Sequence, residues 1–216
     1  MELAFRVALI LVGSYLVGAI PFSLLVGKLF YKVDLRLQGS GNLGATNVYR
    51  VFGWKAGLSV AILDIAKGSA AVGLAALLTP AEFVSLQQDW LLIVAAMAAV
   101  AGHSYSPYIR FKGGKGVATA AGALLFVTPM AWMFLLVTFV SVSLITRYVS
   151  LGSICAAVLY PILVTMFYRD RPAVIVAGFA IAAVVLWRHR TNIVRLYRGE
   201  ESKIRFKKPS SPKEDS

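Results

Sequence analysis

A loop rich in glycine, hydroxyl and amide side chains follows the first apolar stretch of the chain. It covers residues 38–50 and reads QGSGNLGATNVYR. Glycine allows backbone N–H groups to approach an anion closely, and serine, threonine and asparagine add neutral donors and acceptors. Arg50 adds a forked cation that suits phosphate. The loop is therefore a candidate phosphate site, and a flexible turn capped by serine and asparagine is the alternative.

A second glycine-rich loop covers residues 111–119, FKGGKGVAT, directly before a predicted helix. The N-terminus of such a helix suits an anion, because unpaired N–H groups and the positive end of the dipole face the ligand. The loop is not a Walker A motif, since Gly116 follows Lys115 where serine or threonine is required. The alternative is a capped helix start whose lysines extend toward water.

A third polar segment, residues 188–196, reads RHRTNIVRL and follows the last apolar stretch. If it is helical, His189 and Asn192 share one face and can point toward the two loops. Histidine exchanges a proton near neutral pH, and the flanking arginines would hold an anion nearby. The alternative is a basic helix lying on anionic lipid headgroups, which is the interpretation we favour for Arg195 and Arg198.

Ionisable residues also occur inside two apolar stretches. Asp64 and Lys67 are three residues apart, and because charge in a membrane is costly we expect them to pair with each other or with a neighbour. A functional role and a structural ion pair both stay open for them. His103 ends the next apolar stretch, and a direct role for it also stays open.

Metal chemistry and nucleic-acid binding do not fit this composition. Acidic residues near the polar loops are too sparse for a two-metal centre, and two histidines with one cysteine cannot form a recognisable zinc site. The formal net charge is +12, but lysine and arginine lie in the gaps between apolar stretches rather than along one soluble face. We therefore expect anionic ligands, no metal, no cofactor and no nucleic-acid partner.

The elements that must position these segments are membrane-spanning helices. Hydrophobic residues make up 58% of the 216 residues and the mean hydropathy is +0.73, more than a soluble domain needs. We expect the first apolar stretch to be a retained span rather than a cleaved signal. About 20 apolar residues cross a bilayer, which predicts spans at 4–29, 55–79, 90–105, 149–168 and 173–188.

The stretch 117–147 is too long for one comfortable span and carries Pro129 near its middle. A single helix there would place the basic C-terminal segment outside, against the positive-inside rule. Two helices divided at Pro129 remove that conflict. The sequence thus predicts an all-α transmembrane bundle of seven spans, with the N-terminus outside and the C-terminus cytoplasmic. We expect one domain over residues 1–206 and a flexible basic and polar tail over 207–216.

Together these segments resemble the bacterial membrane acyltransferases that use acyl phosphate to acylate glycerol 3-phosphate. The resemblance lies in residues 18–23 (GAIPFS), 39–50, 64–68 and 111–119, in His103, in residues 189–192, and in Gly199, Glu201 and Lys203. It implies an activity in phospholipid biosynthesis that yields lysophosphatidic acid and phosphate without coenzyme A. It also implies the bacterial inner membrane, an active site facing the cytoplasm, and a soluble partner enzyme that makes the reactive acyl phosphate.

Site roles follow as a hypothesis from the residues and the resemblance. Two phosphorylated substrates need two anion sites, while the acyl tail can remain in lipid. Acyl phosphate has a good leaving group, so alignment and oxyanion stabilisation suffice without a covalent acyl-enzyme. Phosphate binding is assigned to Ser40, Arg50, Lys112 and Lys115.

The remaining polar groups have positioning roles. Loop N–H groups with Asn42 or Asn47 position the carbonyl, and His189 and Asn192 orient the hydroxyl. Whether His189 or a substrate phosphate takes the proton stays open. The candidate catalytic residues are His189, Asn192 and Ser40. The candidate binding residues are Gly39, Gly41, Asn42, Gly44, Thr46, Asn47, Arg50, Lys112, Gly113, Gly114, Lys115 and Gly116, and undecided roles remain for Asp64, Lys67, His103 and Glu201.

Two other classes of function compete with this hypothesis. A small-anion transporter could line its path with glycine and lysine loops, but the polar groups gather at one membrane face. A noncatalytic membrane anchor could recruit partners through its basic tail, but it would leave residues 40–50 unexplained.

Overall fold

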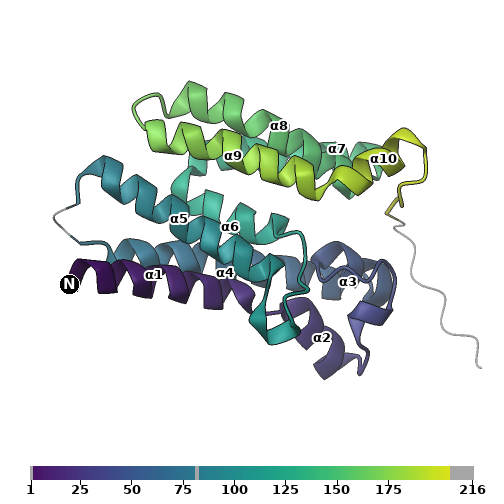
Figure 1. Cartoon of the computed structure of the whole chain (residues 1–216). Coiled ribbons are helices and arrows are strands. Elements are labelled where there is room, and N and C mark those ends of the chain that lie inside the picture. The colour runs from purple at the N-terminus through teal and green to yellow at the C-terminus, as the bar shows by residue number, and fades with distance from the viewer. Residues whose placement is uncertain (1, 81–82, 205–216) are drawn as a thin grey trace, which may run out of the picture.

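The computed structural model describes residues 2–80 and 83–204, and the regular elements in that part of the chain are all helices (Figure 1). The predicted tail, residues 207–216, lies outside the described residues. The elements are α1 (Glu2–Ala19), α2 (Phe22–Phe30), η1 (Leu35–Leu37), α3 (Ala45–Phe52), α4 (Trp54–Leu78), α5 (Ser85–Ser104), η2 (Pro107–Ile109), α6 (Val117–Val127), α7 (Pro129–Thr146), α8 (Val149–Phe167), α9 (Pro172–Arg188) and α10 (Arg190–Tyr197).

The helices form two layers. Helices α1, α4, α5 and α6 pack together as one layer, helices α7, α8 and α9 form the other, and α5 also contacts α9 (Figure 1). Close approach of α4 and α6 depends on glycine, because a Cβ at Gly68 would collide with the backbone of Thr119 and one at Gly122 with that of Ile65. Transmembrane helices that pack this closely have small residues instead of large ones at their interface.

Most predicted spans agree with the helices. Five segments are long and apolar enough to cross a membrane, or six if α9 and the bent α10 count as one, and α6 is a shorter apolar helix, all within the described residues. The predicted break at Pro129 is confirmed, since α6 ends at Val127 and α7 begins with the proline. Proline fits the first turn of a helix, where its missing N–H has no partner to lose.

The first predicted span, 4–29, agrees with the apolar segment Ala4–Phe30, which is long enough to cross a membrane, but the helix within it is interrupted. Helix α1 ends at Ala19 and α2 begins at Phe22, because Pro21 has no N–H with which to continue the helical hydrogen bonds. The carbonyls freed at the break find partners elsewhere in the chain. Ser106 Oγ donates to Ala19 O (2.7 Å), and the buried Lys67 Nζ donates to Ile20 O (2.8 Å).

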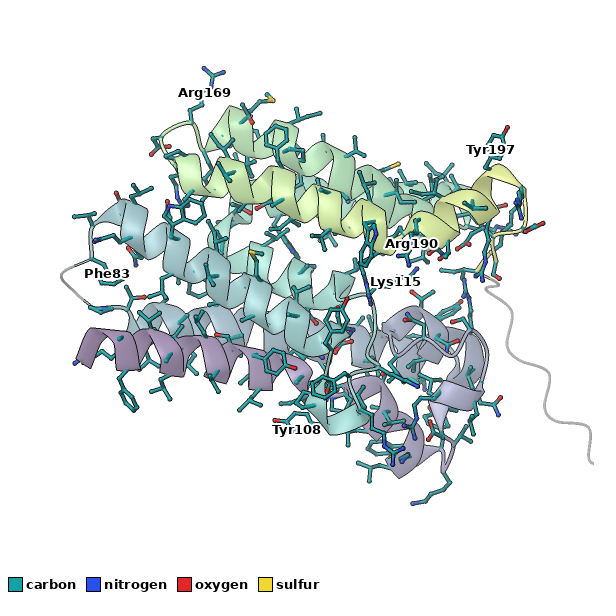
Figure 2. The ribbon with its side chains drawn as sticks, in the orientation of Figure 1. Phe83, Tyr108, Lys115, Arg169, Arg190 and Tyr197 are labelled. Atoms are coloured by element: carbon teal, nitrogen blue, oxygen red, sulfur yellow. The ribbon has the colours of Figure 1, made fainter. Side chains whose placement is uncertain are left out.

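The three polar segments meet at one end of the bundle. Helices α2, α3 and α10 lie at that end, and α1 begins at the opposite end (Figure 1). In Figure 2, Phe83 and Arg169 mark the end where α1 begins, and Tyr197 marks the polar end. The fold therefore gathers the glycine-rich loops and the third segment around one place.

Candidate active site

A cavity of about 500 Å³ opens at the polar end between the two layers. Its wall combines polar groups from the loops and α10 with apolar side chains from α6, α7, α8 and α9. The predicted site residues in its wall are Ser40, Asn42, Gly44, Thr46, Asn47, Arg50, Asp64, His103, Lys115, Gly116, His189, Asn192 and Glu201.

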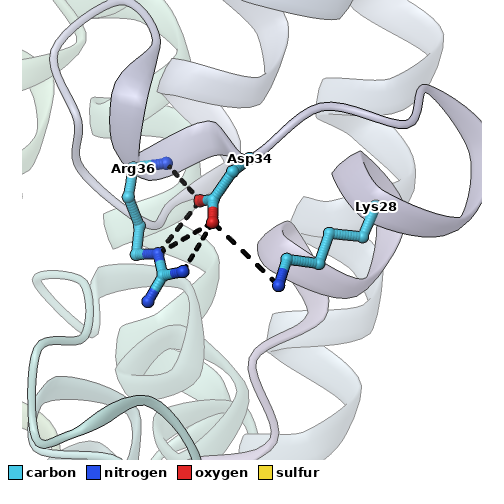
Figure 3. A network of polar contacts seen from close by, with 3 residues as sticks. All are labelled: Lys28, Asp34 and Arg36. Carbon is cyan, nitrogen blue, oxygen red and sulfur yellow. Dashed lines mark hydrogen bonds and ion pairs between the residues drawn. The ribbon is translucent and has the colours of Figure 1, made fainter.

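The chain enters the first loop through a charged turn. Asp34 accepts from the backbone N–H of Arg36 (3.0 Å) and thereby caps η1, and its carboxylate also pairs with the Arg36 guanidinium (2.5 Å) (Figure 3). The hydrogen bonds from Arg36 lower the pKa of Asp34 to about 2. Because this turn is exposed, it guides the chain without entering the cavity.

Asn47 braces the first loop from inside. Its buried amide donates through Nδ2 to Gln38 O (3.0 Å) and accepts from Ser40 N (2.9 Å). Gly39 has φ +59° and lies against this amide, where a Cβ would collide with Asn47 Oδ1. The Asn47 amide is therefore used within the loop and holds Ser40 at the cavity wall.

Arg50 extends from the last turn of α3 into the cavity wall. Its Nη2 donates to Ser202 O (3.0 Å), while its Nε is buried and makes no hydrogen bond in the described structure. Buried donors are normally paired, so an unused N–H at a cavity wall points to a bound ligand or water as its partner.

The second loop lies directly on the end of α5. A Cβ at Gly113 would collide with the His103 carbonyl, and one at Gly114 would collide with the His103 ring and with Leu43 O. Gly114 O also accepts from Arg188 Nη2 (2.7 Å). These glycines are required for close packing, which brings Lys115 into the space between the two layers (Figure 2).

Several predicted binding residues lie outside the cavity wall. Lys112 is exposed and does not line it, so the structure gives this lysine no contact with the site. Gly39, Gly41, Gly113 and Gly114 are also absent from the lining and act through loop shape instead.

His189 stands at the 59° bend between α9 and α10. The ring is buried, and its Nδ1 lies 2.8 Å from Val185 O. A carbonyl oxygen only accepts, so Nδ1 carries the hydrogen and the neutral ring has its lone pair on Nε2. The bend thus presents a histidine prepared to accept a hydrogen bond.

A chain of polar contacts joins four segments at the cavity mouth. Lys115 Nζ donates to Asn192 Oδ1, Asn192 Nδ2 donates to Glu201 Oε1 (2.8 Å), and Ser150 Oγ donates to the same oxygen (2.7 Å). These contacts connect the second loop, α10, the segment after α10 and the start of α8.

The ammonium of Lys115 is held in an unfavourable place. Burial lowers its pKa to about 8, Glu201 opposes that shift, and the guanidinium groups of Arg188, Arg195 and Arg50 add to it. Below pH 8 this lysine is mostly charged, and an anion in the cavity would relieve the repulsion among these cations.

The predicted pairing of Asp64 with Lys67 is confirmed. Lys67 Nζ lies 2.6 Å from Asp64 Oδ1, and both side chains are buried. His103 Nδ1 lies 3.7 Å from the same oxygen and 3.2 Å from Thr119 Oγ1. This buried group supports the His103 ring beneath Gly114. Asp64 and His103 line the cavity, and Lys67 does not.

Arg195, which the sequence analysis placed with the lipid headgroups, is exposed and also lines the cavity. Ser150, Ser153, Thr191 and Ser202 also line the cavity and were missed. The available signal was the pair Ser150 and Ser153, three residues apart at the start of an apolar span.

The deep part of the cavity is apolar. It is lined by side chains of α6, α7, α8 and α9, among them Leu124, Trp132, Leu135, Phe139, Ala157 and Ile181. Cationic groups at the mouth and a hydrocarbon-like interior suit a molecule with a charged head and an aliphatic tail.

The sequence has close relatives of assigned activity. The family model for glycerol-3-phosphate acyltransferase matches residues 8–199. A glycerol-3-phosphate acyltransferase of Geobacillus kaustophilus is 42% identical over 92% of this chain and 96% of its own length. Another, from Macrococcus caseolyticus, is 44% identical over 94% of this chain and 100% of its own length.

Solved structures agree in fold. The glycerol 3-phosphate form of PlsY, an integral membrane glycerol 3-phosphate acyltransferase, has a TM-score of 0.82 at 37% identity over 92% of this chain and 96% of its own. Its lysophosphatidic acid form has a TM-score of 0.80 at 35% identity over 93% and 96%. This chain is therefore a multi-pass membrane protein that belongs to the PlsY-type glycerol-3-phosphate acyltransferase family.

Proposed function

We propose that this protein transfers an acyl group from acyl phosphate to the 1-hydroxyl of glycerol 3-phosphate, producing lysophosphatidic acid and inorganic phosphate. The observation that carries the proposal is one cavity with a cationic mouth and an apolar depth. Two phosphates can share the mouth, and the acyl chain occupies the depth rather than remaining wholly in lipid. Family membership supports the acceptor, and the several cationic residues in the cavity wall support a donor that also carries phosphate.

The residues at the mouth have distinct roles in this proposal. Arg50, Lys115 and Arg195 hold the phosphates, and Ser40 with the first-loop N–H groups faces the reacting carbonyl. Asn47 positions Ser40, while Asn42, Gly44, Thr46 and Gly116 complete the wall.

The chemistry needs one proton acceptor and one leaving group. The glycerol oxygen forms a bond to the acyl carbon as the bond from that carbon to the phosphate oxygen breaks, and phosphate leaves with the electron pair. The hydroxyl proton passes to His189 Nε2 and then to the departing phosphate, while Asn192 orients the hydroxyl. No covalent acyl-enzyme is needed.

The membrane arrangement in the proposal has seven spans, with the N-terminus outside and the site at the cytoplasmic face of the inner membrane. Arg171 Nη1 donates to Val127 O (3.2 Å), so α6 reaches the end of the bundle opposite the site and α7 returns. The cations gathered at the site end support a cytoplasmic orientation. A reporter fused after Ser216 should behave as cytoplasmic, and a periplasmic signal would contradict this arrangement.

The central test is an assay with purified protein in detergent. Acyl phosphate with glycerol 3-phosphate should release phosphate and form lysophosphatidic acid in equal amounts, while acyl-CoA should not replace the donor. A transporter would leave both substrates intact, and turnover with acyl-CoA alone would overturn the donor assignment. In the same assay, His189→Ala should lower kcat by about 10²–10⁴, and near-normal kcat at saturating substrate would remove His189 as the base.

The apolar depth has its own test. Ala157→Phe should reduce turnover of long-chain donors about tenfold more than that of short-chain donors, because the added ring fills the deep cavity. Equal loss with all donors would place the acyl tail elsewhere.

We also propose that a soluble enzyme supplies the acyl phosphate, since a mixed anhydride is reactive in water.

A further inference from the structure

The carboxylate of Glu201 fixes the direction of a neighbouring amide. Its Oε1 accepts from Ser150 Oγ (2.7 Å) and from Asn192 Nδ2 (2.8 Å). With Nδ2 donated to Glu201, the amide oxygen of Asn192 faces the Lys115 ammonium, which donates to it. A reversed amide would turn its N–H groups toward that ammonium, and neither group could then accept.

The backbone holds Glu201 in place from both sides. Gly199, with φ +71°, turns the chain after α10, since this conformation is cheap only without a Cβ. Ser202 O then accepts from Arg50, and Ile204 N donates to Arg147 O (2.8 Å). Glu201 therefore reaches the cavity wall from an anchored segment.

The charges around Lys115 are unevenly distributed. Arg50 on α3, Arg188 on α9 and Arg195 on α10 all act against its charged form. His189 also stands at the cavity wall. Glu201 is the acidic group that favours the charged form of Lys115 in the described part of the chain.

We propose that Glu201 is a positioning residue for the acyl transfer, because it orients Asn192 and keeps the Lys115 ammonium directed at the substrate phosphate. Ser150 assists by holding the carboxylate. This inference rests on the proposed function and adds to it a residue that touches neither reacting group.

The pH dependence of glycerol 3-phosphate binding tests the charge of Glu201. Binding to wild-type protein, measured by calorimetry without donor, should weaken above pH 8 as Lys115 loses its proton. Glu201→Gln keeps an acceptor oxygen for Asn192 and Ser150 but removes the negative charge. In this variant the pH at which glycerol 3-phosphate binding weakens should be lower by about one unit, because a nearby carboxylate stabilises an ammonium.

Glu201→Ala tests orientation in the turnover assay. It should lower kcat/KM about 10- to 100-fold at pH 7 through the lost charge-assisted hydrogen bond, while Glu201→Gln should lose much less. Glu200 is exposed and is the matched control, so Glu200→Gln and Glu200→Ala should match wild type. The Tm of every variant is measured in detergent to separate misfolding from misorientation.

The outcomes separate this inference from the function on which it depends. The role of Glu201 would be overturned if binding to Glu201→Gln weakened at the same pH as in wild type. Wild-type turnover by a folded Glu201→Ala would also overturn it. Equal effects from the Glu200 variants would do the same. Failure of the proposed function would instead appear as absence of turnover by the wild-type protein, and the pH dependence of binding could still be measured.

Discussion

The two ends of the bundle hold their arginines differently. At the end away from the site, Arg171 forms two hydrogen bonds with the Asp89 carboxylate (2.5 and 2.9 Å), a third with Val127 O, and lies over the Tyr168 ring. At the site, Arg50 has one carbonyl partner and an unused Nε. A cation with a full set of partners stabilises the fold, whereas cations in excess of their partners form a place for an anion.

Removing Arg171, the arginine with a full set of partners, should have the largest effect on the stability of the fold. Arg171→Ala leaves the Asp89 carboxylate buried without its partner, which costs about 3–5 kcal/mol. Thermal unfolding in detergent should show a strongly lowered Tm, while the protein that remains folded keeps its kcat. The double variant Arg171→Met with Asp89→Leu should recover most of the Tm. A folded Arg171→Ala without turnover would show that this end also serves the reaction.

Removing Arg50, the arginine with an unused Nε, should affect the kinetics more than the stability. Arg50→Ala should lower kcat/KM for glycerol 3-phosphate about 10- to 100-fold, the value of a hydrogen bond to a charged group. Its Tm should change little, because the buried guanidinium is poorly paired in the free protein. Arg50→Lys should recover only part of the activity, since a lysine cannot match the forked geometry. A large fall in Tm with unchanged kinetics would make Arg50 a structural residue like Arg171.

The pH profile should distinguish the site from the opposite end. The pKa of Lys115 is about 8, lower than in water, so its charge is present below pH 8 and is lost above it. The KM for glycerol 3-phosphate should therefore rise about fivefold between pH 8 and pH 9. Lys115→Arg stays charged over this range and should show a flat profile. A rise that persists in Lys115→Arg would come from a different group.

The smallest effect is expected at the exposed turn before the first loop. Asp34 has a pKa of about 2, below its ordinary 3.8, so its ion pairs contribute above pH 4 and are lost as the pH falls toward 2. Exposed pairs contribute little to folding. Asp34→Asn should therefore leave both Tm and KM at pH 7 within experimental error. A measurable rise in KM would mean that this turn shapes the first loop.

Local rules in the sequence were enough for much of the fold. Pro129 marked the boundary between two helices because proline acts on its own backbone. Asp64 and Lys67 were paired correctly because their spacing places them on one helix face. The composition of the loops also predicted many residues of the cavity wall, because the loops are long, polar and rich in glycine.

The remaining features depend on contacts between distant segments. The carbonyls at the Pro21 break accept hydrogen bonds from Ser106 and Lys67, and neither residue is close to the break in sequence. Arg195 lines the cavity beyond a bend whose angle no local pattern encodes. Asn47 was assigned to substrate, but its amide is used by its own loop. Lys112 and Lys115 look alike in sequence, and only the packing of Gly113 and Gly114 shows which one enters the cavity.

The interruption of the first span has a consequence for biogenesis. In the bilayer, Ile20 O keeps the Phe22 N–H as a local donor (3.1 Å) but lacks its second partner until α4 packs beside it, which makes the α1–α2 segment less stable alone. That second partner is Lys67, whose ammonium is paired within α4 with the Asp64 carboxylate (2.6 Å) but is still costly to place in hydrocarbon. The two segments therefore relieve each other's cost, and we expect the translocon to release them together as a helical hairpin.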